Sequence, residues 1–370
     1  MKKKLIALAC MVSIMATALV GCGSNNSNDS NDKGSSSNSS KGNEIALVTA
    51  TGTIDDKSFN QGSWEGVKQY AEETDIAHKY YSAIDESDEA IINAMELAVK
   101  GGAKIVICPG YYFEVALGQL QTKYPDVTFV MLDGTPTVDK KEVINDNVAA
   151  YLYAEQEAGF LAGYAAVKDG YRKLGFMGGI AIPSVVRFGY GYVQGAEYAA
   201  KELGLSKDEV EVKYTYVGNF DASPDNMAIA ATWYNEGTEV IFACGGSVGN
   251  SVMKAASTAK KAVIGVDVDQ SSESDTVITS AMKNISKTVY DALTEFYAGT
   301  LKTGVSTTLN ATTESVMLPM DTSSFKTFTQ EDYEAVYKKV VDGEVTIDTN
   351  EAAETADQLN LEFVKVVVRQ

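Results

Sequence analysis

The sequence predicts an α/β protein with two doubly wound, parallel-sheet domains in tandem and a ligand cleft between them. Short apolar segments typical of strands alternate with longer segments whose apolar residues recur at helical spacing. This alternation runs twice along the chain, and polar residues follow the strands in both halves. Open parallel sheets bind ligands at the carboxyl ends of their strands, so the same pattern indicates where a site would lie.

The first 22 residues are interpreted as an export signal outside the fold. Three lysines are followed by the apolar residues 5–20, a stretch shorter than the roughly 20 residues that span a bilayer. The sequence Leu-Val-Gly-Cys at residues 19–22 resembles a bacterial lipobox, in which Cys22 receives lipid, including palmitate, and becomes the new first residue. The alternative is an ordinary secretory signal that contains this cysteine by accident.

Residues 23–43 are predicted to be a disordered tether. They consist almost entirely of Ser, Asn, Gly, Asp and Lys, and such a segment cannot bury enough apolar surface to offset its conformational entropy. A flexible tether would let a folded body work beside the membrane.

Composition excludes several classes of function. The formal charge is −19, and loss of the three N-terminal lysines lowers it by 3 to −22. Such a chain is not expected to bind nucleic acid or to adhere to an anionic bilayer by charge alone. His78 is the only histidine and no Cys/His cluster has metal-ligand spacing, so we expect neither a metal nor a cofactor. Cys108 and Cys244 lie in apolar runs, where we favour buried free thiols over a disulfide.

In the first half of the chain that follows the tether, the sequence predicts strands and helices in strict alternation. The expected strands are residues 45–49, 78–82, 104–108 and 127–132, and the expected helices are residues 59–74, 87–100 and 113–124.

The second half repeats this order of elements. The expected strands are residues 174–177, 210–217, 239–243 and 262–266, and the expected helices are residues 188–203, 224–235 and 249–259. Residues 102–110 and 237–245 resemble each other about 135 positions apart, and Asp133 and Asp267 each follow the last of these strands. A repeated order of elements at nearly constant spacing indicates a duplication.

The loop at residues 51–66 is predicted to form half of a small-molecule clamp. It follows the first strand and carries the carboxylates Asp55 and Asp56, the ring of Phe59 and the amide of Asn60. An aromatic ring offers a flat stacking surface, and carboxylates and amides offer directional hydrogen bonds. In the second half, the polar segments 219–221, 245–249 and 267–270 follow strands in the same way. If the two domains face each other, these loops line one cleft.

Several motifs resemble the basic membrane protein family, which comprises lipoprotein substrate-binding proteins of ABC importers and includes purine nucleoside receptors. They are Asp-Asp-Lys-Ser-Phe-Asn-Gln at 55–61, Phe188 with the glycines up to Gly195, and the segments 244–249, 264–270 and 279–283. The resemblance runs from about Glu44 to about Val345. It implies the type I periplasmic-binding-protein fold, two Rossmann-like domains joined by a hinge.

The resemblance also implies a ligand site drawn from both halves, made of Asp56, Phe59, Asn60, Asp133, Phe220, Gly246, Asp267 and Lys283. Phe59 and Phe220 would sandwich a purine ring. Asp56 would either contact the base or support the loop. The alternative for Phe59, which we favour less, is a core residue that caps the first helix.

The remaining five residues would form the polar contacts. Asn60 and Asp133 would bond the edge of the base, and Gly246, Asp267 and Lys283 would hold the ribose. An aspartate after a strand is also commonly a turn or helix-cap residue, which is the alternative for Asp133 and Asp267.

We therefore expect a lipid-anchored, non-enzymatic receptor on the extracytoplasmic face of the cell membrane. It would act as a monomer, bind inosine, guanosine or adenosine, and deliver it to an ABC permease. The expected N-terminal lobe is residues 44–147 plus about 284–311, and the C-terminal lobe is residues 148–283 plus about 312–370. The segment after Asn350 matches nothing in the family and is interpreted as an added strand.

The sequence also allows functions other than a nucleoside receptor. The same fold could bind riboflavin or a sugar, or serve as a surface sensor. A nucleoside hydrolase that uses clustered aspartates is disfavoured because a single Asp-Asp pair lacks the usual metal-binding cluster.

Overall fold

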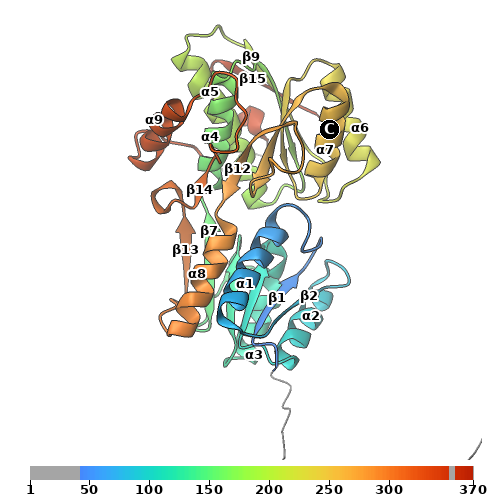
Figure 1. Cartoon of the computed structure of the whole chain (residues 1–370), viewed down its shortest axis with the longest axis vertical. Coiled ribbons are helices and arrows are strands. Elements are labelled where there is room, and N and C mark those ends of the chain that lie inside the picture. The colour runs from blue at the N-terminus through green and yellow to red at the C-terminus, as the bar shows by residue number, and fades with distance from the viewer. Residues whose placement is uncertain (1–41, 350–354, 370) are drawn as a thin grey trace, which may run out of the picture. The chain divides into compact units, whose positions relative to one another are not determined.

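A computed structural model describes residues 42–349 and 355–369 of the chain. The predicted signal peptide, Cys22 and nearly all of the predicted tether lie outside these residues. Within them, no helix is both long and apolar enough to cross a membrane. Two mainly parallel sheets, each covered by helices, form most of the structure of the described residues (Figure 1).

The first sheet has the strand order β13-β7-β4-β3-β1-β2, and all its neighbouring strands are parallel. Its strands are β1 (Ile45–Thr49), β2 (His78–Ser82), β3 (Ile105–Pro109), β4 (Thr128–Leu132), β7 (Val148–Tyr153) and β13 (Val305–Leu309). β1 and β3 are buried along their whole length, as expected for parallel strands with helices on both faces.

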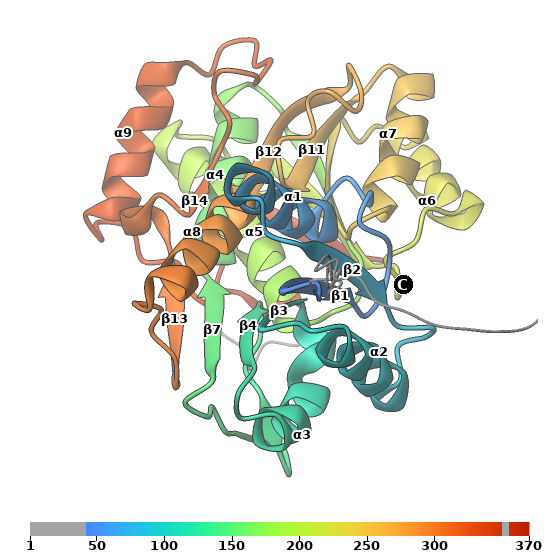
Figure 2. The same ribbon diagram turned by 60° about the horizontal axis from the view of Figure 1, so that its bottom comes forward.

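Four helices cover this sheet, and they are α1 (Phe59–Thr74), α2 (Asp88–Lys100), α3 (Glu114–Lys123) and α8 (Ile285–Ala298). α1 and α8 lie side by side in both views (Figures 1 and 2). Ile45 and Leu47 pack in one apolar cluster, whereas Ala46 and Val48 pack in another. This separation follows from strand geometry, because successive side chains point to opposite faces.

The second sheet has the order β14-β12-β11-β10-β8-β9-β15 and is parallel except for β14. Its strands are β8 (Lys173–Gly178), β9 (Val210–Tyr216), β10 (Val240–Cys244), β11 (Ala262–Asp267), β12 (Val277–Lys283), β14 (Val316–Met317) and β15 (Val364–Val368). Its helices are α4 (Glu155–Lys168), α5 (Pro183–Glu202), α6 (Pro224–Asn235), α7 (Val248–Ala259) and α9 (Gln330–Val341). A small separate pair is formed by β5 (Thr137–Val138) and β6 (Lys141–Glu142).

The predicted duplication is visible in the strand order. In chain order, the five core strands of each sheet are arranged fifth, fourth, third, first, second: β7-β4-β3-β1-β2 in one and β12-β11-β10-β8-β9 in the other. The predicted α/β fold of two parallel-sheet lobes is therefore confirmed. The fifth strand of each lobe was not predicted, and β13, β14 and β15 are additions at the sheet edges. β15 confirms the strand expected after Asn350, and it pairs in parallel with β9.

The chain crosses between the lobes at three places, next to Ala154, next to Asn284 and between β13 and β14. These crossings are joined by backbone hydrogen bonds from Ala154 N to Leu309 O (2.8 Å) and from Asn284 N to Ser315 O (2.8 Å). The boundary expected after residue 147 is corrected by this arrangement. β7 pairs with β4 in the first sheet, so the first lobe continues to Tyr153.

Glycines allow α4 and α5 to pack at close range. A Cβ atom on Gly163 would lie 1.9 Å from the Tyr192 carbonyl oxygen, and one on Gly195 would lie 1.9 Å from the Phe160 carbonyl oxygen. Both positions therefore require glycine. α5 starts at Pro183 and not at the expected residue 188, because proline suits the first turn of a helix.

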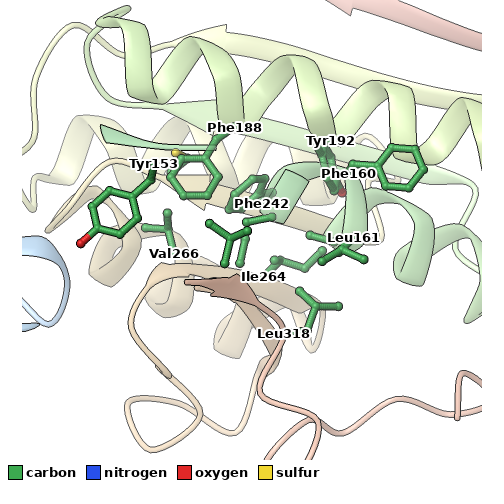
Figure 3. Packing of buried hydrophobic residues seen from close by; sticks show 14 of the residues in the cluster. Tyr153, Phe160, Leu161, Phe188, Tyr192, Phe242, Ile264, Val266 and Leu318 are labelled. Atoms are coloured by element: carbon green, nitrogen blue, oxygen red, sulfur yellow. The ribbon is translucent and has the colours of Figure 1, made fainter. Parts of the chain in front are cut away.

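The core of the second lobe lies between these two helices and its sheet. Figure 3 shows Phe188 beside Tyr153, with Phe242 and Val266 next to them. The rings of Phe188 and Phe242 meet edge to face at 5.8 Å. Cys108 and Cys244 are buried and unpaired, as expected. This packing fixes the inner ends of α4 and α5, from which the site described below is built.

Candidate ligand-binding site

A cavity of about 450 Å³ lies between the two lobes, at the carboxyl ends of the strands of both sheets. The structure brings all eight residues nominated from the sequence to its wall: Asp56, Phe59, Asn60, Asp133, Phe220, Gly246, Asp267 and Lys283. The volume falls in the range of small-molecule pockets, and an interface between lobes is a common place for them.

The first-lobe wall is a loop that Asp56 ties to the start of α1. Its Oδ1 accepts hydrogen bonds from the backbone N–H groups of Ser58 (2.9 Å) and Gln61 (3.0 Å), and its Oδ2 accepts one from Asn60 N–H (3.1 Å). A carboxylate at a helix N-terminus satisfies backbone donors that lack partners within the helix. These contacts favour loop support over base contact, the two roles left open for Asp56.

Phe59 and Phe220 line the cavity from opposite lobes. Phe220 follows Asn219, whose Oδ1 accepts hydrogen bonds from Asp221 N–H (3.0 Å) and Asn226 Nδ2 (2.9 Å). A Cβ atom at Gly179 would lie only 2.4 Å from the Phe220 ring, so the Gly-Gly turn after β8 makes room for it. Gly246 has φ of 54°, the left-handed region that favours glycine.

One buried ammonium group joins most of the polar residues of the site. Lys283, with a side chain 2% exposed, places Nζ 2.5 Å from Asp133 Oδ2, 3.4 Å from Asp267 Oδ1 and 3.6 Å from Glu155 Oε1. The same Nζ lies 4.5 Å from the centre of the Phe59 ring. Asp133, which the resemblance assigns to the base edge, is thus bonded directly to the lysine assigned to the ribose.

Asp133 and Asp267 occupy equivalent positions in the two lobes and share an unusual backbone conformation. Their φ angles are 60° and 67°, in the left-handed region that few residues other than glycine adopt. Such strain costs on the order of 1 kcal/mol or more and gathers at functional sites. Both carboxylates lie close to Lys283 Nζ, and Asp267 Oδ2 also accepts a hydrogen bond from Ser58 Oγ of the other lobe (2.6 Å).

Burial changes the proton affinities of the site. It raises the pKa of Asp56 to about 6, even though the N–H groups of Gln61, Ser58 and Asn60 oppose the shift. Burial also raises the pKa of Asp133; Lys283 lowers it without cancelling that effect. For Lys283, burial lowers the pKa, but the carboxylates of Asp133, Asp267 and Glu155 outweigh it and raise the pKa above its usual value.

The site is rich in hydrogen-bond acceptors. Asp133 Oδ1 is buried and accepts no hydrogen bond from residues 42–349 or 355–369. A buried acceptor without a donor costs about 1–3 kcal/mol, which a ligand hydroxyl or N–H group would recover. The site therefore suits a neutral ligand that presents several donors and a flat ring. Across the residues described, no group of three or more His, Cys, Asp or Glu side chains is arranged to hold a metal ion.

Sequence reasoning missed three residues that complete the site. Phe188 lines the cavity, Ser58 bonds Asp267, and the fully buried Glu155 lies behind Lys283. Phe188 was noted only as part of a family motif. Glu155 begins a helix that is otherwise almost entirely buried, and an acid at the start of so apolar a segment would have been a signal had that helix been predicted.

Gln270, in a loop expected to line the cleft, does not line the cavity. Its side chain is locked between the lobes, where Nε2 donates to the Lys57 carbonyl oxygen (2.6 Å) and Oε1 accepts from Val266 N–H (3.0 Å). Gln270 thus connects the loop after β11 to the first-lobe loop that contains Lys57, which is a structural role.

Comparison with known proteins places these features in a family. The Bmp family model, described as ABC transporter substrate-binding protein PnrA-like, matches residues 44–351. The ABC transporter nucleoside-binding protein BmpA of Lactococcus lactis is 28% identical over 94% of this chain and 99% of its own length. Basic membrane protein A of Borreliella burgdorferi is 30% identical over 71% of this chain and 75% of its own length.

Solved structures support the fold. A solute-binding protein of an ABC transporter system from Aeropyrum pernix K1 superposes with a TM-score of 0.72 at 21% identity, covering 85% of this chain and 95% of that one. One from Conexibacter woesei gives 0.66 at 20% identity, covering 82% and 98%. The resemblance read from the motifs and the periplasmic-binding-protein fold that it implied are both confirmed.

Removal of the Asp56 charge is expected to change how stability depends on pH. Because the pKa of Asp56 is raised to about 6 in the folded state, this group stabilises the fold below about pH 4, and that stability is lost as pH rises through about 6. As pH rises from below about 4 to above about 6, the unfolding free energy of wild type should fall by about 3 kcal/mol more than that of Asp56→Asn. Urea denaturation across this pH range measures the difference.

Asp55→Asn is the matched control, because it removes an exposed charge from the same loop. A constant stability difference between wild type and Asp56→Asn at every pH would contradict the burial argument.

Proposed function

This chain belongs to the Bmp family of PnrA-like ABC transporter substrate-binding proteins, whose role is to bind a solute and not to transform it, and we propose that its solute is a purine nucleoside. In this proposal, inosine, guanosine or adenosine binds in the cavity between the lobes. The protein is a monomer, is held at the extracytoplasmic face of the membrane by lipid on Cys22, and delivers the nucleoside to a permease that has a separate ATPase.

The observation that carries the proposal is that Phe59 and Phe220 reach one cavity from different lobes, beside a buried cluster of acceptors. A purine has two faces, and a ring on each face would add about 0.5–1.5 kcal/mol beyond burial of area. The name of the Lactococcus relative, a nucleoside-binding protein, agrees with this ligand class.

The polar contacts divide between the base and the ribose. Asn60 and Asp133 bond the edge of the base, and Asp133 Oδ1 accepts no hydrogen bond from the described residues, so a donor of the base can use it. Gly246, Asp267 and Lys283 hold the ribose, whose hydroxyl groups both donate and accept. Since a carboxylate takes two donors at once, Asp267 suits a diol.

Transport follows from contacts to both lobes. A ligand that touches Phe59 on one lobe and Phe220 on the other binds the closed arrangement better than the open one, and it shifts the population towards closure. The closed protein then docks on the permease and releases its ligand there.

Substitution of Phe220 by alanine is expected to weaken nucleoside binding roughly tenfold or more, because one stacking face and its burial are lost. Calorimetric titration of residues 42–370 with inosine, guanosine, adenosine, free bases, riboflavin and sugars measures this. Phe325→Ala is the matched control, since Phe325 is also a half-buried ring but lies outside the cavity.

The titration distinguishes the alternatives. Binding of riboflavin or a sugar without nucleoside binding would replace the proposed ligand on the same fold. Binding of none of these compounds would favour a surface sensor. Release of free base and ribose from a bound nucleoside would indicate a hydrolase instead.

Cys22→Ala is expected to abolish lipid attachment and to release the protein from membranes. Metabolic labelling with a palmitate analogue, followed by membrane fractionation, measures both effects. A variant that stays labelled and membrane-bound would contradict anchoring through Cys22.

A further inference from the structure

Glu155 is a fully buried carboxylate that touches the ligand site without lining the cavity. It is the first residue of α4 and directly follows Ala154, where the chain crosses between the lobes. A helix N-terminus favours a negative charge, so this position suits a carboxylate. The close glycine packing of α4 on α5 holds this position in the second lobe.

The two oxygens of Glu155 have different surroundings. Oε2 accepts a hydrogen bond from Arg187 Nε (2.6 Å), so Arg187 orients the carboxylate. Oε1 lies 3.6 Å from Lys283 Nζ and accepts no hydrogen bond from the described part of the chain. A buried carboxylate oxygen without a hydrogen bond costs free energy unless attraction to a nearby positive charge, here Lys283, offsets that cost.

The carboxylates around Lys283 come from different lobes. Asp133 belongs to the first lobe, whereas Asp267 and Glu155 belong to the second lobe, as Lys283 itself does. When the lobes separate, Asp133 leaves with the first lobe. A buried ammonium that lost its partners would be strongly destabilising, so a second-lobe carboxylate is needed to hold it.

We infer that Glu155 is a positioning residue of the ligand site, which together with Arg187 holds the Lys283 ammonium in place within the second lobe. Lys283 is thereby preorganised before the ligand and Asp133 arrive, which lowers the cost of ordering it on binding. This inference rests on the proposed function for the role of Lys283 as a ligand contact.

The test begins with a double-mutant cycle that needs no ligand. Glu155→Gln, Lys283→Met and the double variant are compared with wild type by urea denaturation. Glu155→Gln is expected to raise the unfolding constant of the wild-type protein. If Glu155 compensates the charge of Lys283, the factor of this increase should be at least tenfold smaller in the Lys283→Met variant. Additive costs would overturn the inference, whatever the ligand of the protein is.

Binding of inosine provides the second measurement. Glu155→Gln should raise the dissociation constant about tenfold, and Glu155→Asp should restore part of the affinity because it restores the charge. Asp169→Asn is the matched control, since Asp169 is a buried second-lobe carboxylate that binds the N–H groups of residues 326–328 away from the cavity. It should lower stability and leave the dissociation constant unchanged.

The outcomes separate this inference from the proposed function. An unchanged dissociation constant in Glu155→Gln would overturn the inference while nucleoside binding stands. Failure of wild type to bind any nucleoside would overturn the proposed function, and the unfolding cycle would still decide the role of Glu155.

Discussion

The Lys283 ammonium is almost completely removed from water, and the site depends on how this charge is compensated. Transfer of a charge into the interior of a protein costs several kcal/mol, which carboxylates must offset at close range. Asp133 of one lobe and Asp267 and Glu155 of the other provide this compensation. Lys283 lines the cavity, and its carboxylate partners come from both lobes. A ligand that contacts Lys283 therefore also affects the contact between the lobes.

The duplicated architecture explains why these groups meet. Asp133 and Asp267 follow equivalent strands of the two lobes and adopt nearly the same left-handed conformation. The carboxyl ends of both sheets face the cavity, so an aspartate from each lobe reaches the same lysine. Phe59 and Phe220 use the same edges to bring a ring from each lobe. The structural repeat thus accounts for the matched aspartates, whereas the two rings follow non-equivalent strands, β1 for Phe59 and β9 for Phe220.

Much of this arrangement could be predicted from local patterns. α1 and β1 were predicted to the residue, because their apolar spacing is regular and polar residues mark their ends. The missed elements lack such signals. β12 mixes Thr, Ser and Lys with apolar residues, and α4 is buried nearly all round, so neither shows a clear two-sided pattern. Glu155 and Ser58 were missed because their importance lies in partners that are distant along the chain and meet only in the fold.

A crystal structure grown with inosine would show directly which groups of both lobes hold the ligand. The proposed binding mode places a base between the rings of Phe59 and Phe220 and a ribose hydroxyl within hydrogen-bond distance of Asp267. It leaves Lys283 surrounded by carboxylates from both lobes. A base bound outside the two rings, or a Lys283 side chain turned away from both aspartates, would contradict it.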